Sequence, residues 1–447
     1  MKRLVRAWLI VIALCLGFLG ACGGAPPSPE PTVASGANVD ATPSPVLRCP
    51  VERVPEVTDL GLRHPPSLDK PAPREPFRDP VFGSCVVRVT DHRADAASPG
   101  LKNAYARVQA FNSDGTRLLI YGTDGAWVLY DAVTLEPLGE LPLGDEPRWD
   151  ARDPDRLTYM EETRLMAFDV AREEVEVVRD FVDDVPDGTM MVWTAHEGRP
   201  SMDGRFFGLM AENDAWVPVA FLIYDRDADE VIVRDMRRVV GIEDDVDHVT
   251  ISPKGTCFLA SFDRACGVGQ LGTEARPCGL MVYDRDLTNG RGLLRIVGHY
   301  DVALDRKGRE VAVYQDLDTD HISVLDLATG AVIPLWPIDF SHTPLGFHFS
   351  GLAYDKPGWA LVSTYSGGYP KAYTWMDDQV FALELIAGGQ VVRLAHTHSK
   401  VDPRRDHDYW AEPHATVNRD FTRVVFTSNW GRSGTEAVDA YMIVLED

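Results

Sequence analysis

The residues best suited to chemistry in this chain are five histidines that recur along it: His196, His248, His299, His348 and His414. Neutral imidazole is a common ligand of zinc, copper, iron and nickel, and it also titrates near neutral pH. Each of the five stands at or just before an apolar run of strand character. We expect the histidines to converge, either as ligands or as hydrogen-bonding groups that exclude water.

One of these histidines belongs to a segment that sharpens the prediction, Tyr409-Trp410-Ala411-Glu412-Pro413-His414. In an extended strand, alternate side chains point to the same face, so Glu412 and His414 share one. With His348 from an earlier apolar run, they predict a site for a divalent metal ion with open positions. Two imidazoles and one carboxylate suit Mn, Fe, Zn or Ni, and an ion held in this way is a Lewis acid.

Aromatic side chains are dense in the last part of the chain, where rings are able to stack on the faces of sugars. A ligand at the metal site is therefore expected to meet both aromatic and histidine side chains. The predicted ligand contacts are Tyr409, Trp410, His196 and His248.

The elements that position these residues repeat along the chain. Each repeat has an apolar strand, a turn containing Asp or Ser and Gly, a second apolar strand, and a third that ends in an aromatic or aliphatic residue and Asp. A period of about 40–60 residues with several strands in each unit is typical of a β-propeller. The turns are Ser113-Asp114-Gly115, Ser201–Gly204, Ser252–Gly255, Asp305–Gly308 and Asp355–Gly358.

Counting the repeats predicts an all-β, seven-bladed propeller over residues 79–447. The last unit has only three strands of its own, and the strand Cys85–Thr90 belongs to no other unit. We expect that strand to join the last blade and close the ring, which hides two sheet edges. A β-sandwich, or six blades with an extra sheet, is the alternative. The units lie near 105–141, 146–181, 193–236, 248–297, 299–338, 348–396 and 413–446.

The N-terminus predicts export. A basic start and an apolar run precede Leu19-Gly20-Ala21-Cys22, which resembles the lipobox of bacterial lipoproteins. That resemblance implies a signal peptide over residues 1–21 and lipidation of Cys22; a plain signal peptide with an incidental cysteine is the alternative. Residues 22–78, rich in Pro, Ala and Ser, are expected to form a flexible tether. The protein would then be anchored outside the cytoplasm, in an outer membrane or on a monoderm's cell surface.

The formal net charge of −24 limits the partners. Such a surface repels nucleic acid and anionic membrane, and it opposes polyanionic substrates. We therefore expect contact with the membrane only through the lipid, and no nucleic-acid partner.

Export also permits disulfides. Cys49 with Cys85, and Cys266 with Cys278, are candidate pairs that the sequence does not prove, and Cys257 is expected to be a buried free thiol.

The repeats resemble those of exported TolB-type and WD40-like bacterial propellers, whose hallmark is a Ser-Pro-Asp-Gly-type turn followed by a strand such as Val424–Ser428. This resemblance covers most of residues 100–447. It implies the fold and is silent on function, because propellers serve as scaffolds, receptors, hydrolases and lyases.

The segment 409–414 is similar to that of the oligogalacturonate lyases, metal-dependent propellers that cleave pectin fragments by β-elimination. The resemblance implies that His348, Glu412 and His414 are metal ligands, that His299 is an active-site histidine and that Arg276 is the catalytic base. Glu412 stands where that family has a histidine, and Tyr409 stands where it has a glutamine.

From the sequence we expect a propeller that binds a carbohydrate or peptide ligand at a histidine-rich central mouth. One alternative is a divalent-metal-dependent polysaccharide lyase, in which Arg276 or His299 removes the α-proton of a uronate. The other alternative is a scaffold that contacts envelope proteins.

Overall fold

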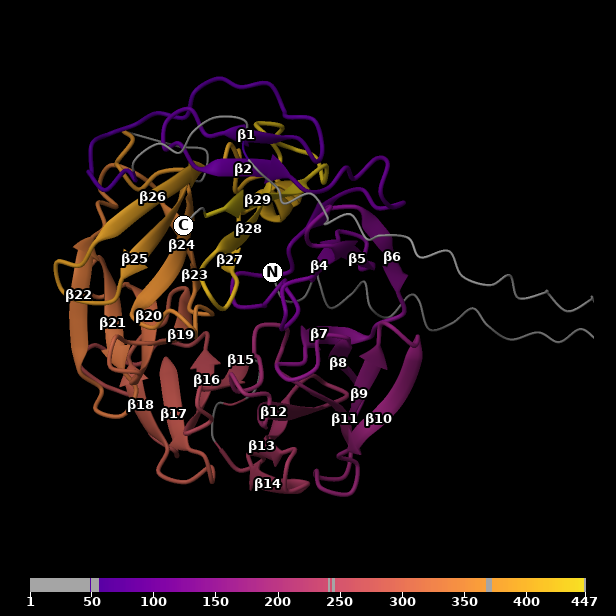
Figure 1. Cartoon of the computed structure of the whole chain (residues 1–447). Coiled ribbons are helices and arrows are strands. Elements are labelled where there is room, and N and C mark those ends of the chain that lie inside the picture. The colour runs from indigo at the N-terminus through magenta and orange to yellow at the C-terminus, as the bar shows by residue number, and fades with distance from the viewer. Residues whose placement is uncertain (1–48, 50–55, 240–241, 243–245, 367–371, 446–447) are drawn as a thin grey trace, which may run out of the picture. The chain divides into compact units, whose positions relative to one another are not determined.

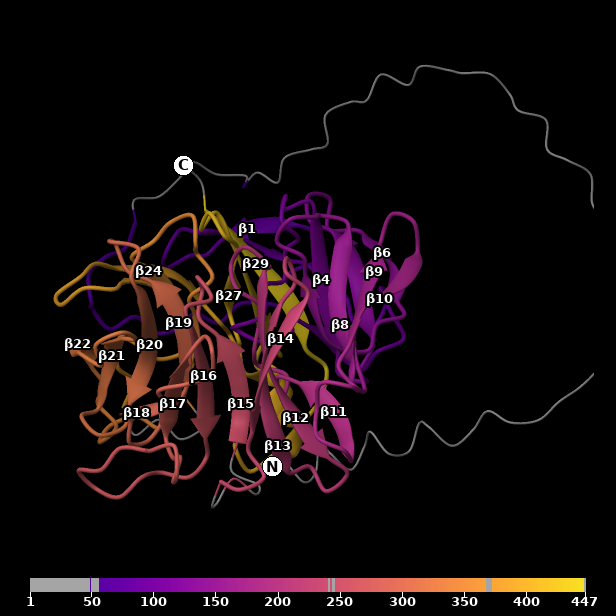
Figure 2. The same ribbon diagram turned by 90° about the horizontal axis from the view of Figure 1, so that it is seen from below.

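The computed structural model describes Cys49 and residues 56–239, 242, 246–366 and 372–445. The predicted signal peptide and Cys22 lie outside these residues. Within the unit Ser44–Asp447, the described strands form seven sheets that follow one another around a central axis (Figure 1). Figure 2 shows the strands of the blades running along that axis. The predicted seven-bladed propeller is confirmed. Among the described residues, no helix is long and apolar enough to cross a membrane.

Each of the first six blades is a sheet of antiparallel strands in chain order. The first blade contains β3 (Leu101–Lys102), β4 (Arg117–Gly122), β5 (Trp127–Asp131) and β6 (Pro137–Leu141). The second contains β7 (Asp145–Trp149), β8 (Arg156–Glu161), β9 (Arg164–Asp169) and β10 (Glu174–Asp180). The third contains β11 (Thr189–Trp193), β12 (Phe206–Asn213), β13 (Pro218–Asp225) and β14 (Glu230–Asp235). The fourth blade contains β15 (Val246–Ile251), β16 (Cys257–Phe262), β17 (Leu280–Asp284) and β18 (Arg291–Leu294). The fifth contains β19 (Tyr300–Leu304), β20 (Glu310–Asp316), β21 (His321–Asp326) and β22 (Val332–Pro337). The sixth contains β23 (Gly346–Ser350), β24 (Trp359–Tyr365), β25 (Gln379–Glu384) and β26 (Val391–His396).

The seventh blade joins the two ends of the chain. Its strands are β27 (Thr416–Val417), β28 (Arg423–Ser428), β29 (Asp439–Val444), β2 (Cys85–Arg88) and β1 (Pro76–Arg78). β2 pairs antiparallel with β29, with Cys85 opposite Val444 and Val87 opposite Met442. This pairing covers the backbone edge of β29, which would otherwise be open to other chains.

The segment before β1, expected to belong to a flexible tether, packs against the last two blades. The guanidinium of the buried Arg393, in β26, donates to the carbonyl oxygens of Gly61 at 2.6 Å and Asp59 at 3.3 Å. Trp430 Nε1 donates to the carbonyl oxygen of Leu68 at 3.1 Å. The disulfide between Cys49 and Cys85 ties this segment to β2.

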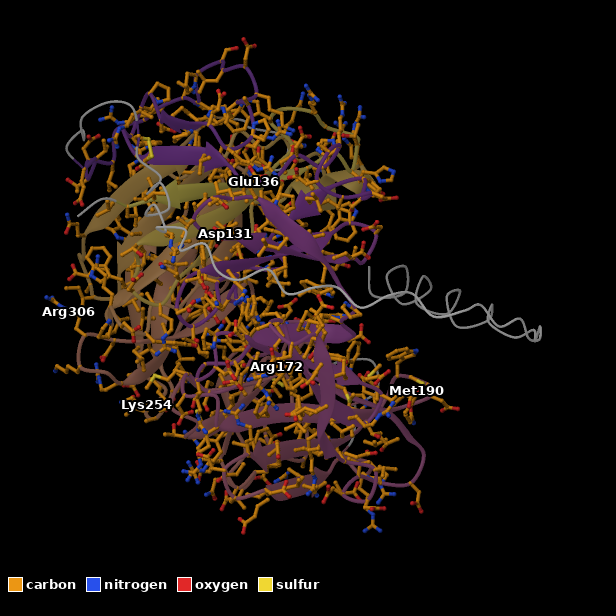
Figure 3. The ribbon with its side chains drawn as sticks, turned by 45° about the vertical axis from the view of Figure 1, so that its right-hand side comes forward. Asp131, Glu136, Arg172, Met190, Lys254 and Arg306 are labelled. Carbon is orange, nitrogen blue, oxygen red and sulfur yellow. A yellow bond between two sulfur atoms is a disulfide. The ribbon has the colours of Figure 1, made fainter. Side chains whose placement is uncertain are left out.

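The repeated turns explain why aspartate and glycine recur in the sequence. In the fifth blade, one carboxylate oxygen of Asp305 accepts hydrogen bonds from the backbone N–H groups of Lys307 and Arg309, each at 2.8 Å. Gly308 has a φ of 70°, a left-handed conformation that glycine adopts at little cost. Figure 3 shows Lys254 and Arg306, from the turns of the fourth and fifth blades, on the same side of the molecule.

The core lies between neighbouring blades, where the faces of the sheets pack together. Phe221 of β13 meets Phe258 of β16 at 5.0 Å between ring centroids, and Tyr283 of β17 packs on both. All three side chains are buried. Such contacts between adjacent blades hold the inner strands, and the side chains that they carry, at fixed positions around the axis.

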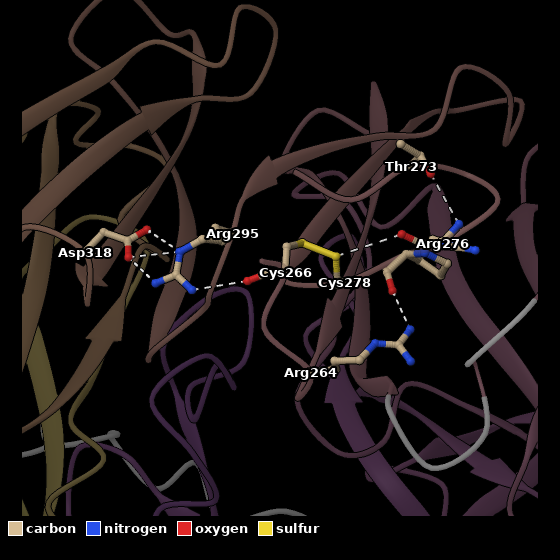
Figure 4. Close-up of a disulfide and its surroundings, with 8 residues drawn as sticks. Arg264, Cys266, Thr273, Arg276, Cys278, Arg295 and Asp318 are labelled. Atoms are coloured by element: carbon tan, nitrogen blue, oxygen red, sulfur yellow. Dashed lines mark hydrogen bonds and ion pairs between the residues drawn. A yellow bond between two sulfur atoms is a disulfide. The ribbon is translucent and has the colours of Figure 1, made fainter. Parts of the chain in front are cut away.

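A disulfide-linked insertion separates β16 from β17 in the fourth blade. Cys266 and Cys278 form the predicted disulfide, and the Arg295 side chain bonds both the carbonyl oxygen of Cys266 and the carboxylate of Asp318 (Figure 4). Cys257 is a buried free thiol, also as predicted. The two disulfides are of the kind that forms in oxidising compartments outside the cytoplasm.

Candidate metal site at the central mouth

The predicted metal ligands come from two neighbouring blades. His348 lies in the innermost strand of the sixth blade, β23, and Glu412 and His414 precede β27, the innermost strand of the seventh. Each offers one ligand atom, and these three atoms all lie within 4.8 Å of one another. The blade packing therefore brings together residues that are far apart in the chain. We refer to His348, Glu412 and His414 as the triad.

The local structure of the triad differs from the extended strand that we expected. Residues Asp406–Ala411 form a 3-10 helix, η2, and Glu412 is its C-terminal cap. His414, after Pro413, has a φ of 43°, so the chain turns sharply before it enters β27. Glu412 and His414 still meet, but through this bend and not through the alternation of a strand.

The triad is compact and mostly shielded from water. His348 Nε2 lies 2.9 Å from Glu412 Oε2, and His414 Nε2 lies 3.5 Å from the same oxygen. Both imidazoles are at most 1% exposed, whereas the Glu412 side chain is 14% exposed. His348 Nδ1 and His414 Nε2 have no hydrogen-bond partner among the described residues. Buried nitrogens without a partner are uncommon, and a metal ion beside Glu412 would satisfy the one on His414.

Burial also sets the protonation of the triad. It lowers the pKa values of His348 and His414 well below the usual range, so both imidazoles are neutral, which is the form that binds metal ions. Burial raises the pKa of Glu412 to about 7, although His299, the Tyr365 hydroxyl and Lys102 act in the opposite direction. A bound cation would favour the ionised carboxylate, because opposite charges attract strongly away from water.

A lysine from the first blade also contacts the triad. Lys102 Nζ lies 3.0 Å from His414 Nδ1, and the side chain is only 2% exposed. Burial lowers the pKa of Lys102 to about 8. If Lys102 donates a hydrogen bond to Nδ1, the proton of the neutral His414 ring is on Nε2. That N–H then faces the Glu412 carboxylate, and the cluster needs no metal ion. If neutral Lys102 accepts from Nδ1, His414 Nε2 is free to bind an ion.

His299 and Tyr105 adjoin the triad. The His299 ring lies 4.7 Å from that of His348, and Tyr105 Oη lies 3.4 Å from His299 Nδ1. Burial, followed by the nearby His348, lowers the pKa of His299 to about 3. His299 is therefore a neutral imidazole beside the triad that is able to accept a hydrogen bond but is a weak base at neutral pH.

His248 belongs to a second cluster, with Glu197 and Asp247. Its Nε2 lies 2.9 Å from Tyr300 Oη, and its Nδ1 lies 3.0 Å from an Asp247 carboxylate oxygen. Arg107 forms an ion pair with Glu197 at 3.0 Å and also contacts His248. A guanidinium thus already provides a positive charge in this cluster.

The remaining predicted residues, His196 and Arg276, make no described contact with the triad. His196 is exposed, has a φ of 73° and packs on Trp193 at 4.9 Å between ring centroids. Arg276 is exposed in the disulfide-linked insertion, where its backbone bonds to Thr273 (Figure 4). No described contact joins Arg276 to the triad.

The two aromatic residues predicted to contact a ligand flank the triad. The ring of Tyr409, which is 43% exposed, lies 5.9 Å from the His414 ring. The Trp410 ring lies 5.5 Å from Lys102 Nζ.

Sequence reasoning missed Lys102, Tyr105 and Arg107, although all three precede the first turn of the repeat at Ser113-Asp114-Gly115. The signal was their position in the repeat. They precede this turn much as the histidines precede the turns of later blades. Because the first blade has no histidine at this position, a search for histidines does not find its contribution to the site.

No protein-family model and no curated protein matches this chain. Among solved structures, an oligogalacturonate lyase in complex with manganese is 17% identical, covers 83% of this chain and 96% of its own, and has a TM-score of 0.57. The oligogalacturonate lyase of Vibrio parahaemolyticus is 14% identical with the same coverage and a TM-score of 0.55. At these identities the likeness shows a shared fold, and it confirms the distant resemblance to the oligogalacturonate lyases.

Proposed function

We propose that this protein binds a divalent transition-metal ion at the triad and uses it to hold an oxygen-bearing ligand at the central mouth. The observation that carries the proposal is the convergence of two buried, neutral imidazoles and one carboxylate. Two nitrogens and one oxygen suit Mn, Fe, Zn or Ni and leave coordination positions open for a ligand. That a solved structure of the same fold contains manganese supports the proposal.

The ligand is a carbohydrate or a peptide. Tyr409 provides an exposed ring beside the triad, and aromatic faces of this kind stack on sugars and on apolar side chains. The two disulfides support a location outside the cytoplasm, where polysaccharides and peptides of the envelope are found. Lipidation of Cys22 would keep the propeller near a membrane without any spanning segment.

A metal-dependent lyase is the second candidate, and the placement of His299 favours it. A bound ion would supply Lewis acidity toward a uronate carboxylate and thereby acidify the adjacent C–H. His299 lies beside the triad, with Tyr105 Oη near its ring, and is the candidate to accept that proton, although its low pKa makes it a weak base. The carboxylates of Glu197 and Asp247 at the mouth oppose a polyanionic chain. A scaffold for envelope proteins is the third candidate.

The test is the metal content of the purified protein, measured by mass spectrometry after incubation with manganese, iron, zinc or nickel. We expect about one ion per chain in the wild type and loss of that ion in His348→Ala and His414→Ala. His342→Ala, which removes an exposed histidine away from the triad, is the matched control and should retain the ion. Absence of metal from the wild type would refute both metal-dependent candidates and leave the scaffold.

A further inference from the structure

A cavity of about 160 Å³ lies at the end of the central channel opposite the triad. Its walls are the turns that follow the innermost strands, whereas the triad lies where the innermost strands begin. Five blades, the first, second, third, sixth and seventh, contribute to it. The turns that line it are Asn112–Gly115, Asp150–Ala151, Pro200–Met202, Leu352–Asp355 and Asn418–Asp420.

One arginine in this wall, Arg423, differs from the arginines at the same position in other blades. Five blades have an arginine at the start of the second strand. Four of these arginines form ion pairs: Arg117 with Asp155, Arg156 with Glu176, Arg205 with Asp225, and Arg309 with Asp305 and Asp326. Arg423 is the fifth, it lines the cavity, and no carboxylate of the described residues forms an ion pair with it.

The surroundings of Arg423 hold its guanidinium in place without neutralising it. The group lies over the Phe111 ring at 4.6 Å, and its one hydrogen bond among the described residues is a long one, 3.4 Å, to the carbonyl oxygen of Ala132. A Cβ atom on Gly115 would lie 2.1 Å from an Arg423 nitrogen, so only glycine fits beside it. Burial lowers the pKa of Arg423, although Asp420 and Asp114 raise it. A partly buried cation without an anionic partner is costly to maintain.

The nearby aspartates are engaged in their own turns. One carboxylate oxygen of Asp114 accepts from the N–H and the hydroxyl of Thr116, and Asp420 makes the same pair of bonds with Thr422. Neither aspartate lies within ion-pair distance of Arg423, so the guanidinium keeps unused N–H donors beside an open cavity.

A second cation stands in the same wall. Arg419 makes long hydrogen bonds of 3.3 Å to both carboxylate oxygens of Asp355 and donates to the carbonyl oxygen of Met202 at 2.8 Å. Its guanidinium lies 5.4 Å from the Tyr354 ring. The wall thus combines the unpaired guanidinium of Arg423, whose planar geometry matches a carboxylate, with a second arginine already paired with Asp355 and with aromatic surface.

We propose that this cavity is a second ligand site, independent of the triad, which binds a compact carboxylate through Arg423 with Arg419 at its side. The small volume favours a short organic acid or the C-terminal carboxylate of a polypeptide. Either source supplies the anion that the Arg423 guanidinium lacks.

The proposal is tested by isothermal titration calorimetry of the whole protein with three probes: succinate, the tripeptide Gly-Gly-Ala, and the same tripeptide amidated at its C-terminus. We expect saturable binding of one carboxylate probe per chain and no binding of the amide. Arg423→Met should weaken binding by about tenfold or more, because a charge-assisted bidentate bond is lost. Arg423→Lys keeps the positive charge but lacks the two parallel N–H donors of a guanidinium, so this variant should bind the carboxylate probe with intermediate affinity.

Arg309→Met is the matched control, because Arg309 occupies the same repeat position, is ion-paired and lies outside the cavity wall. It should leave the affinity unchanged. Tighter binding of the tripeptide than of succinate would identify a chain end as the ligand, and the reverse would identify a free acid. The proposal is overturned by wild-type protein that binds neither carboxylate probe, by equal binding of the amidated tripeptide, or by equal affinity in Arg423→Met.

Discussion

One buried ion pair separates the two ends of the central channel and gives a sharp prediction about stability. Arg199, from the third blade, donates to Asp301 of the fifth blade at 2.7 Å, to the carbonyl oxygens of Val302 and Arg107 at 2.7 and 3.0 Å, and to Tyr354 Oη at 2.8 Å. The side chains of Arg199 and Asp301 are 6% and 2% exposed. This one guanidinium joins four blades across the channel.

The perturbation is Arg199→Met, which keeps much of the side-chain volume and removes the charge. Asp301 would still accept backbone N–H bonds from Gly351 at 2.6 Å and Val302 at 2.8 Å, but it would lose its cation in a site shielded from water. Removing one partner of a buried pair costs about 3–5 kcal/mol, because the other charge stays buried. We expect the free energy of unfolding to fall by that amount.

The assay is urea denaturation followed by tryptophan fluorescence, for Arg199→Met, Asp301→Asn and the double variant. The double variant should lose less than the sum of the two single losses, because neither charge is then left alone. Arg306→Met, which removes an exposed arginine from its pair with the partly buried Glu384, is the control and should cost at most about 1 kcal/mol. A loss below about 1 kcal/mol in Arg199→Met, or strict additivity in the double variant, would refute the reasoning.

Three further predictions concern other parts of the molecule. Replacing Cys266 and Cys278 by serine should lower the free energy of unfolding by about 2–3 kcal/mol, because the unfolded chain gains entropy, and thermal melting with and without reductant checks this. Burial lowers the pKa of His396 to about 4 in the folded protein. Between pH 6.5 and 4, His396 is therefore protonated in the unfolded chain but not in the folded one. Stability should therefore fall as the pH drops from 6.5 toward 4, and His396→Gln should flatten that part of a denaturation series; an unchanged slope would contradict it. Lys102→Met should raise the affinity of the triad for zinc, measured by competition with a chelator, because a neighbouring positive charge is removed; weaker binding would contradict this reading of Lys102.

Most of the fold follows from local patterns in the sequence. The turns identify the blades because each is stabilised within a few residues. In the fifth blade, the Asp305 carboxylate accepts a hydrogen bond from a backbone N–H group, and Gly308 adopts a positive φ. One feature of the fold does not follow from composition. The segment 56–78 looks like a tether because it is rich in proline, yet its carbonyl groups are the acceptors that buried Arg393 needs.

The candidate site was only partly predictable from the sequence. Its histidines could be found because they recur at one position in the repeat. The contact of Lys102 with His414 was not foreseeable, because it joins residues 312 positions apart across the closure between the first and last blades. The 3-10 helix before Glu412 was also missed. Its own Asp408 joins it to other segments, because the Asp408 carboxylate accepts from Ser433 Oγ and from the N–H groups of Gly434 and Asp402.

The most direct test of the central claim is anomalous X-ray diffraction from crystals of this protein grown with manganese. We predict one strong anomalous peak between His348, Glu412 and His414, and no peak at that position in crystals of His414→Ala. A wild-type map without a peak there, with Lys102 bonded to His414 and His348 bonded to Glu412, would show a self-contained polar cluster and would contradict the proposed metal site.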